Sequence, residues 1–204
     1  MNWLAHIFLS EQNIDFQIGN YLADPLKGRA WDKASLDLIN GMKIHKIIDS
    51  YTDTHTQFKQ SKIRLGEKGL LKPIIIDLTY DYLLTKNWDR YCCIPIDEFL
   101  QTFYTYAHKQ LTFLPPKASK SLARLIEFDL LNKYQNLEHL RISFERLDKR
   151  LSARLLQRDQ AISYVQRVND NIKDIENDFL IFFPQLCQKV RNNVNQNKLE
   201  HWKI

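Results

Sequence analysis

The sequence has few of the residues that separate short strands. Only five glycines and six prolines occur among 204 residues, whereas a β-sandwich or β-barrel needs frequent turns. No uncharged apolar run approaches the roughly 18–20 residues that span a bilayer. The apolar start, residues 1–9, lacks the basic residues and the cleavage site of a secretory signal. These absences disfavour β-rich folds and membrane insertion, and they predict a cytoplasmic protein.

Cysteine is also scarce. Cys92 and Cys93 are adjacent, Cys187 is distant, and no C-x-x-C pattern occurs. An odd count with this spacing indicates neither a disulfide framework nor a thiolate zinc site. We expect all three cysteines to be small core residues.

What is present is a helical pattern. Apolar residues recur three and four positions apart along nearly the whole chain. We expect one all-α domain over residues 1–204, a multi-helix bundle with a polar tail from about Asn192. Pro184 should kink or split the last helix. The expected helices cover residues 2–12, 14–24, 34–54, 57–66, 73–89, 96–113, 117–132, 135–156 and 159–199.

Charge is divided unevenly along the chain. Residues 1–100 carry 12 basic and 13 acidic side chains, whereas residues 101–204 carry 17 and 11. Ten of the basic residues lie within 117–158, a segment that can attract nucleic acid, a membrane or an acidic protein. It can also be a solvated helix face with pairs such as Glu145–Lys149. Few aromatic residues interleave for base stacking, which disfavours nucleic acid.

Two acidic residues lie in the most apolar of the expected helices. Asp77 and Asp81 are four residues apart in the 73–89 helix, so they share one face. A carboxylate in apolar surroundings costs several kcal/mol unless it is paired, hydrogen-bonded or bound to a metal. This helix should therefore be central and its carboxylates should have partners.

A second helix carries His45, Asp49 and Asp53 at four-residue steps, and Asp24 stands before a proline where another helix should end. Nitrogen and oxygen ligands of this kind suit Mn²⁺, Mg²⁺ or Zn²⁺. On spacing alone, an ordinary hydrogen bond is more frequent than a metal site. His45 and Asp49 can form a simple hydrogen bond, and His6 can be a buried core histidine.

Four ordered blocks carry a resemblance. They are Met1-Asn2-Trp3-Leu4-Ala5-His6, Gly19-Asn20-Tyr21-Leu22-Ala23-Asp24, Gly41-Met42-Lys43-Ile44-His45-Lys46-Ile47-Ile48-Asp49 with Thr52-Asp53, and Asp77…Tyr80-Asp81-Tyr82-Leu83-Leu84…Trp88. In this order and spacing they resemble the bacterial acyl carrier protein phosphodiesterase family, and beyond residue 90 the resemblance is diffuse. The family is regarded as a divergent relative of the HD-type metal-dependent phosphohydrolases, which implies an all-α, HD-domain-like fold.

The resemblance implies an activity and a partner. It implies a phosphodiesterase that removes 4′-phosphopantetheine from the serine of holo-acyl carrier protein, with Mn²⁺ or Mg²⁺ as cofactor. Acyl carrier proteins present an acidic helix that basic side chains can dock. We expect Arg146, Arg150 and Arg154, four residues apart on the 135–156 helix, to form that docking face.

The resemblance also implies roles for single residues. Asn2 and Asn20 would support the functional side chains through hydrogen bonds. The implied metal ligands are Asp24, His45, Asp49 and Asp77, and the residues implied in catalysis or in support of the ligands are His6, Asp53 and Asp81.

The chain departs from the family pattern at Tyr82, where the family has histidine. A phenol with a pKa near 10 is a poor acid–base catalyst at neutral pH, so a homologue without activity stays an alternative. Two others are an HD-like phosphohydrolase acting on a nucleotide or other small phosphoester, and a non-catalytic, basic RNA-binding module. The sequence does not determine the oligomeric state.

Overall fold

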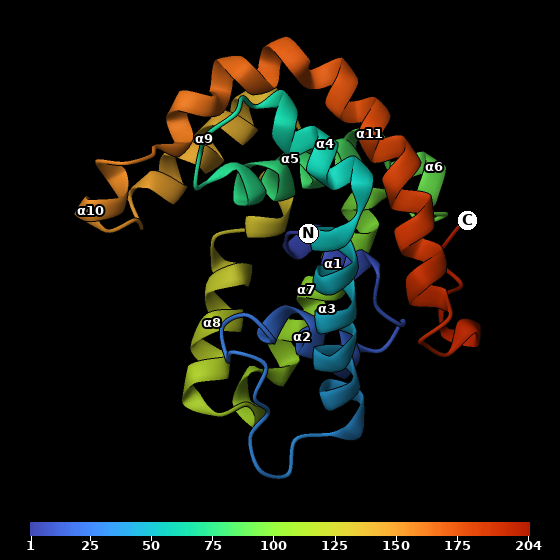
Figure 1. Cartoon of the computed structure of the whole chain (residues 1–204). Coiled ribbons are helices and arrows are strands. Elements are labelled where there is room, and N and C mark those ends of the chain that lie inside the picture. Colours follow the sequence, from blue (N-terminus) through green and yellow to red (C-terminus); the bar gives the residue numbers. More distant parts are fainter.

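Helices form every regular element of the computed structural model, which describes all 204 residues (Figure 1). No β-strand is present, only one isolated bridge between Cys92 and Trp202, so the all-α prediction is confirmed. None of the helices is long and apolar enough to cross a membrane. In chain order they are α1 (Trp3–Phe8), α2 (Ile14–Leu22), α3 (Leu36–Thr54), α4 (Thr56–Arg64), α5 (Lys72–Lys86), α6 (Trp88–Tyr91), α7 (Ile96–Gln110), α8 (Pro116–Glu127), α9 (Leu137–Asp148), α10 (Ala153–Leu156) and α11 (Val165–Arg191), with 3-10 turns at Leu111–Phe113, Leu130–Asn132, Ala161–Tyr164 and Gln196–Lys198.

Local sequence fixes where the helices around the centre of the molecule begin. The side chain of Asn13 accepts a hydrogen bond from the Phe16 amide at the start of α2, and Ser35 does the same for Leu38 at the start of α3. These caps satisfy amides that have no partner within the helix. α5 has a proline in its first turn, where the missing amide hydrogen costs nothing.

Two glycines let α2 and α3 pack backbone against backbone. A Cβ atom on Gly19 would lie 2.1 Å from the Leu38 carbonyl oxygen, and one on Gly41 would lie 2.1 Å from the Phe16 carbonyl oxygen. No larger residue fits either position without separating the helices. This close approach brings the backbone around Asn20 within reach of side chains on α3.

The short helix α1 lies at the middle of the molecule (Figure 1). All its residues from Leu4 to Phe8 are buried. α3 runs beside it, and α11 arches over α4 and α5 before passing down one side. The 51 buried hydrophobic residues form one continuous cluster drawn from helices along the whole chain. A side chain on α1 therefore sits in fixed surroundings.

The basic segment is more broken than its sequence pattern predicts. The expected 135–156 helix ends at Asp148, and a separate helix, α10, starts after Ser152 caps it through the Leu155 amide. The Asp148 carboxylate accepts hydrogen bonds from the amides of Ala161 and Ile162, which draws the chain out of the helix. The expectation that Arg146, Arg150 and Arg154 share one helical face is therefore wrong.

The C-terminal region differs from expectation in two ways. α11 continues through Pro184 instead of splitting there. The segment after Asn192, which its composition marked as a polar tail, is packed against the core. The side chains of His201 and Trp202 are buried, and both donate hydrogen bonds to the Phe8 carbonyl oxygen, at 2.8 and 3.0 Å.

Candidate metal centre

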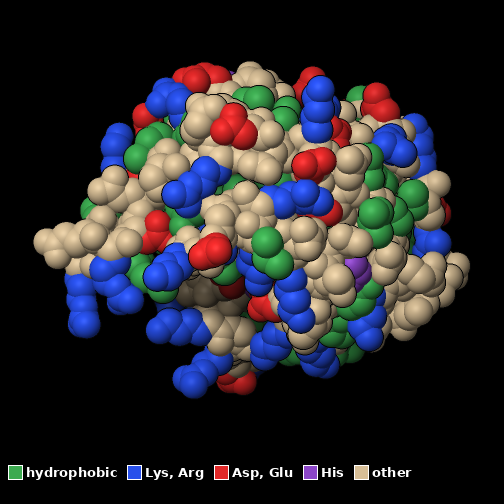
Figure 2. All heavy atoms as spheres, turned by 45° about the horizontal axis from the view of Figure 1, so that its top comes forward, with side chains coloured by type: hydrophobic (Ala, Val, Ile, Leu, Met, Phe, Trp, Pro, Cys, Tyr) green, Lys and Arg blue, Asp and Glu red, His purple; other side chains and the backbone are tan.

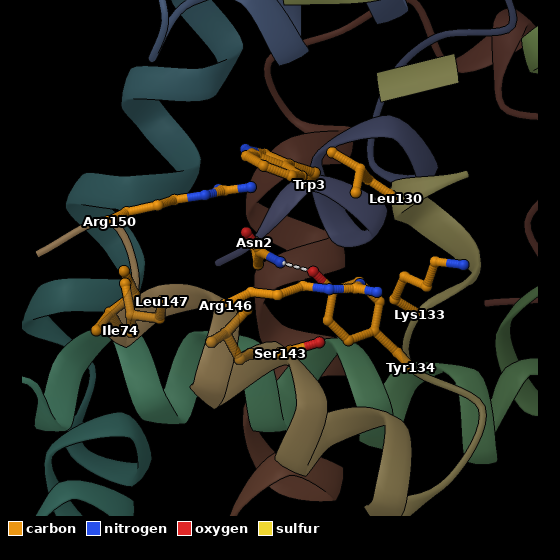
Figure 3. Close-up of a pocket in the computed structure, with 11 residues that line it drawn as sticks. Asn2, Trp3, Ile74, Leu130, Lys133, Tyr134, Ser143, Arg146, Leu147 and Arg150 are labelled. Atoms are coloured by element: carbon orange, nitrogen blue, oxygen red, sulfur yellow. Dashed lines mark hydrogen bonds between the residues drawn. The ribbon is translucent and has the colours of Figure 1, made fainter. Parts of the chain in front are cut away.

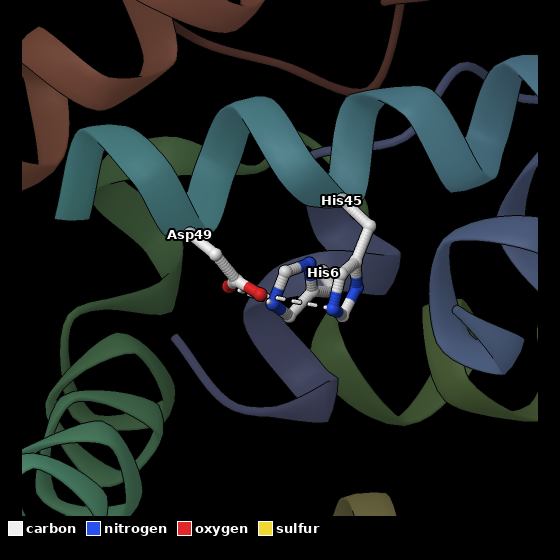
Figure 4. A group of neighbouring side chains, drawn as sticks. All are labelled: His6, His45 and Asp49. Carbon is white, nitrogen blue, oxygen red and sulfur yellow. Dashed lines mark ion pairs between the residues drawn. The ribbon is translucent and has the colours of Figure 1, made fainter. Parts of the chain in front are cut away.

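Three side chains, one from α1 and two from α3, converge on one another (Figure 4). His6 projects from α1, and His45 and Asp49 project from one face of α3. One ligand atom from each lies within 4.8 Å of the other two. His6 Nε2 is 3.2 Å from one Asp49 oxygen, and His45 Nε2 is 3.0 Å from the other. The two imidazole rings stack with their centroids 4.1 Å apart. We refer to these residues as the triad.

A single residue, Asn20 on α2, orients both histidines. Its side-chain oxygen accepts a hydrogen bond from His6 Nδ1, and its backbone oxygen accepts one from His45 Nδ1, both at 2.8 Å. The Asn20 amide nitrogen donates to the His6 carbonyl and to Ser10, which fixes the amide orientation. With Nδ1 protonated, each neutral imidazole directs the lone pair of Nε2 into the triad.

The Nε2 atoms face only hydrogen-bond acceptors. His6 Nε2 is 3.1 Å from the Met1 carbonyl oxygen, in addition to Asp49. His45 Nε2 lies 3.1 Å from Asp24 Oδ1. Burial lowers the pKa of His45, but the carboxylates of Asp24 and Asp49 outweigh it and raise that pKa to about 9. A lone pair among carboxylates requires a proton or a metal ion, so this arrangement fits a bound cation.

The carboxylate of Asp77 adds a further acceptor at the edge of the triad. Its Oδ1 atom is buried and accepts no hydrogen bond of good geometry. The Met1 ammonium group lies 2.9 Å from this atom and 3.8 Å from Asp49, so the two carboxylates share one cation. Burial raises the pKa of Asp77, and the ammonium group opposes that rise.

The structure thus brings together most of the predicted ligands. His45 and Asp49 are in the triad, Asp24 contacts it through His45, and Asp77 reaches it through the Met1 ammonium group. His6, predicted as a catalytic or supporting residue, is a member of the triad. Two imidazole nitrogens with carboxylate oxygens form a set that could hold a divalent metal ion.

Asp81 and Asp53 lie outside this group. The fully buried Asp81 carboxylate accepts hydrogen bonds from the amides of Leu4 and Ala5, at 2.9 and 3.2 Å. It therefore caps the start of α1 from another helix. Burial raises its pKa to about 7 against these two donors. Asp53 is exposed, one turn beyond Asp49, and forms no ion pair or side-chain hydrogen bond.

Tyr82, the departure from the family pattern, is nearly buried on α5. No hydrogen bond or ion pair joins it to the triad, to Asp24 or to Asp77. The phenol therefore makes no polar contact with the converging side chains.

A pocket adjoins the centre on the side of Asn2 and Trp3 (Figure 3). Sequence reasoning did not predict it, because its walls come from four separate segments. The residues that line it are Asn2, Trp3, Ile74, Leu78, Leu130, Lys133, Tyr134, Ser143, Arg146, Leu147 and Arg150. A second hollow shares four of these residues and is lined in addition by Arg124, Glu127, Phe128, Asp129 and Lys149, so five cations and two carboxylates border it. The space-filling view shows Lys and Arg side chains gathered around a hollow on one face (Figure 2).

Comparison with known proteins connects this site with a family. Residues 1–186 match the family model described as acyl carrier protein phosphodiesterase. Proteins of that name from Enterobacter sp. (strain 638) and Photorhabdus laumondii are 25% and 27% identical over 198 residues. These alignments cover 94% of this chain and 98% and 96% of the two relatives. No solved structure matches the chain at a significant level.

Proposed function

The chain belongs to the acyl carrier protein phosphodiesterase family, and from this membership we propose that it hydrolyses the phosphodiester of holo-acyl carrier protein. The bond broken joins the carrier protein's serine to 4′-phosphopantetheine, and the products are apo-protein and free 4′-phosphopantetheine. The observation that carries this proposal is the pair of hydrogen bonds from His6 and His45 to Asn20. They orient the Nε2 lone pairs of both histidines toward one point beside Asp49.

The triad would hold the divalent metal, with Asp24 and Asp77 as further ligands. When bound, such an ion neutralises charge on the phosphoryl oxygens and lowers the pKa of a coordinated water. Mn²⁺ and Mg²⁺ are the candidates we favour, since phosphoryl transfer sites commonly combine these ions with carboxylates.

The protein side chains restrict how a phosphodiester can approach. The Asp24 and Asp49 side chains are 64% and 39% exposed, whereas His6 and His45 are almost fully buried. Substrate must therefore reach the triad from the carboxylate side. Both side-chain oxygens of Asp81 accept hydrogen bonds from backbone amides. Its contribution would be to fix α1, and with it His6 of the triad, in place before substrate binds.

The basic hollow is the surface we propose for docking of the acidic carrier protein. Its cations lie on α8, directly after the 3-10 turn Leu130–Asn132, and at and just beyond the end of α9, where Arg146 and Arg150 border both hollow and pocket. Arg154 lies apart on α10 and is exposed. Complementary charge would raise the rate of productive encounter more than the affinity.

Conversion of holo- to apo-acyl carrier protein tests the function. Mass spectrometry should show loss of the 4′-phosphopantetheine arm with Mn²⁺ or Mg²⁺ and no loss after chelation with EDTA. Asp49→Ala should abolish the reaction, and Asp170→Ala, which removes an exposed carboxylate from α11, should not. Turnover of nucleotides without turnover of holo-protein would instead support the small-phosphoester alternative. Metal-independent RNA binding without hydrolysis would support the binding module.

We also propose that the enzyme works in the cytoplasm. All three cysteines carry free thiols, as a reducing compartment requires. Cys92 and Cys187 are buried, and burial raises the pKa of each thiol, so neither is a reactive thiolate. Cys93 is exposed, so the expectation that all three cysteines are core residues is wrong for this one.

A further inference from the structure

The pocket between α5 and α9 lies beside the candidate metal centre. We propose that it binds the pantetheine chain, the part of the arm that extends beyond the phosphodiester. This inference rests on the proposed function, because it assigns a place to a part of that substrate.

The pocket and the metal centre share a wall. Ile74 and Leu78 line the pocket, and Asp77 projects from the same face of α5, one turn from Ile74. On the opposite wall, Asn2 lines the pocket directly after Met1, which contacts Asp49 and Asp77. A chain attached to a phosphate at the triad can therefore enter the pocket without crossing a helix.

Polar groups in the pocket have hydrogen-bonding capacity that the protein does not use. Asn2 stands at the N-cap position of α1 but does not cap it, because Asp81 accepts from the Leu4 and Ala5 amides. Asn2 instead donates its amide to the Tyr134 hydroxyl (Figure 3). The Asn2 side-chain oxygen then has no donor, and the hydroxyl hydrogen of Tyr134, a residue only 3% exposed, has no protein acceptor. An amide-containing ligand can satisfy both groups.

The remaining residues that line the pocket match the other parts of the pantetheine chain. Trp3, Leu130 and Leu147 offer apolar surface to the dimethyl and methylene groups of pantetheine. No carboxylate lines the pocket, and its three cations, Lys133, Arg146 and Arg150, have no ion-pair partner in the protein. The pocket is open to solvent on one side, as a chain tethered to a carrier protein needs.

A matched pair of substitutions tests the assignment. Ile74, 40% exposed, lines the pocket, and Ile181, 49% exposed, lies on α11 away from it. Ile74→Trp should fill the pocket and lower kcat/KM for holo-acyl carrier protein by about tenfold or more. It should leave hydrolysis of bis(p-nitrophenyl) phosphate, which has no such chain, unchanged. Ile181→Trp should leave both reactions unchanged, and circular dichroism checks the fold of each variant.

Direct binding separates this inference from the proposed function. Calorimetry with 4′-phosphopantetheine, pantetheine and inorganic phosphate should show binding of the first two by the wild-type protein and its loss in Ile74→Trp. That result supports the pocket even if holo-acyl carrier protein is not hydrolysed, in which case the proposed function alone fails. Unchanged turnover of holo-protein by Ile74→Trp, or binding of phosphate but not pantetheine, overturns the assignment.

Discussion

The candidate metal centre and the basic segment, residues 117–158, differ in whether their charged groups have partners within the protein. Around the triad every ionised or ionisable group has a partner: Asp49 contacts both histidines, Asp24 contacts His45, and Asp77 contacts the Met1 ammonium group. In the basic segment Arg141 pairs with Glu138 and Glu145.

The cations that line the basic hollow form no ion pair within the protein. They are Arg124, Lys133, Arg146, Lys149 and Arg150. The comparison agrees with the roles that we propose. Groups that would act on the reacting bond are held in place by partners, and groups that would recognise the carrier protein keep their charges available to it.

The largest expected effect follows from a substitution in the triad, where the charged groups have partners. Asp49→Ala removes the residue that both histidines contact, and should lower kcat by on the order of 10³-fold or more, given the several kcal/mol that a metal contributes. Holo-acyl carrier protein and a small phosphodiester should be affected alike. The fold should persist, because His45 keeps Asp24 and the Met1 ammonium group keeps Asp77. Near-full activity of the variant would make Asp49 a structural residue.

A smaller loss should follow from loosening one histidine. Asn20→Ala removes the acceptor of His6 Nδ1 but leaves the backbone oxygen that holds His45. Loss of such support for a ligand typically lowers metal affinity or activity by roughly 10–100-fold. Competition with a Mn²⁺ indicator measures the affinity. Asn87→Ala, which also removes a hydrogen-bonded asparagine, is the control, and equal Mn²⁺ affinity in both variants would contradict the role of Asn20.

Charge reversal in the basic hollow tests the region whose cations have no partner. Arg146→Glu with Arg150→Glu should lower kcat/KM for holo-acyl carrier protein by about tenfold at low salt, and less as salt screens the charges. Arg154→Glu should have a smaller effect, because α10 lies outside the hollow. Lys173→Glu with Lys189→Glu, at two exposed positions of α11, controls for the same change in net charge. Equal loss with a small phosphodiester would place Arg146 and Arg150 in the metal centre.

The smallest effect concerns stability, away from both regions. Burial lowers the pKa of His201 to about 4, although its hydrogen bond to the Phe8 carbonyl favours the charged form. Between pH 6.5 and 4 the unfolded chain binds a proton that folded His201 does not, so stability falls as the pH is lowered. The loss is about 2–3 kcal/mol at most.

Urea titrations of the wild type and His201→Phe between pH 7 and 4 measure this difference. The phenyl ring replaces an imidazole that stacks on Phe99. A stability difference between the two proteins that does not change with pH would contradict the prediction.

The sequence predicts what depends on local spacing. Periodicity gives the all-α fold, and the four-residue step places His45 and Asp49 on one face of α3. It does not predict contacts made across the chain. That Asp81 caps a helix 77 positions earlier, and that Asn20 holds two histidines through different oxygens, depends on how α1, α2 and α5 pack.

The same limit explains the misplaced boundaries. The 135–156 pattern is helical throughout, and only the hydrogen bonds from residues 161 and 162 to Asp148 end α9 early. Likewise, a polar composition hid the burial of His201 and Trp202.

The carbonyl of Phe8 has a consequence for the order in which the protein matures on the ribosome. Its hydrogen-bond donors belong to residues 201 and 202, so α1 cannot complete its end contacts until the last of these residues has been translated and has left the exit tunnel. His6 lies two residues before this carbonyl. The helices of the first half can form early, but α1 gains these final polar contacts only after residues 201 and 202 have emerged.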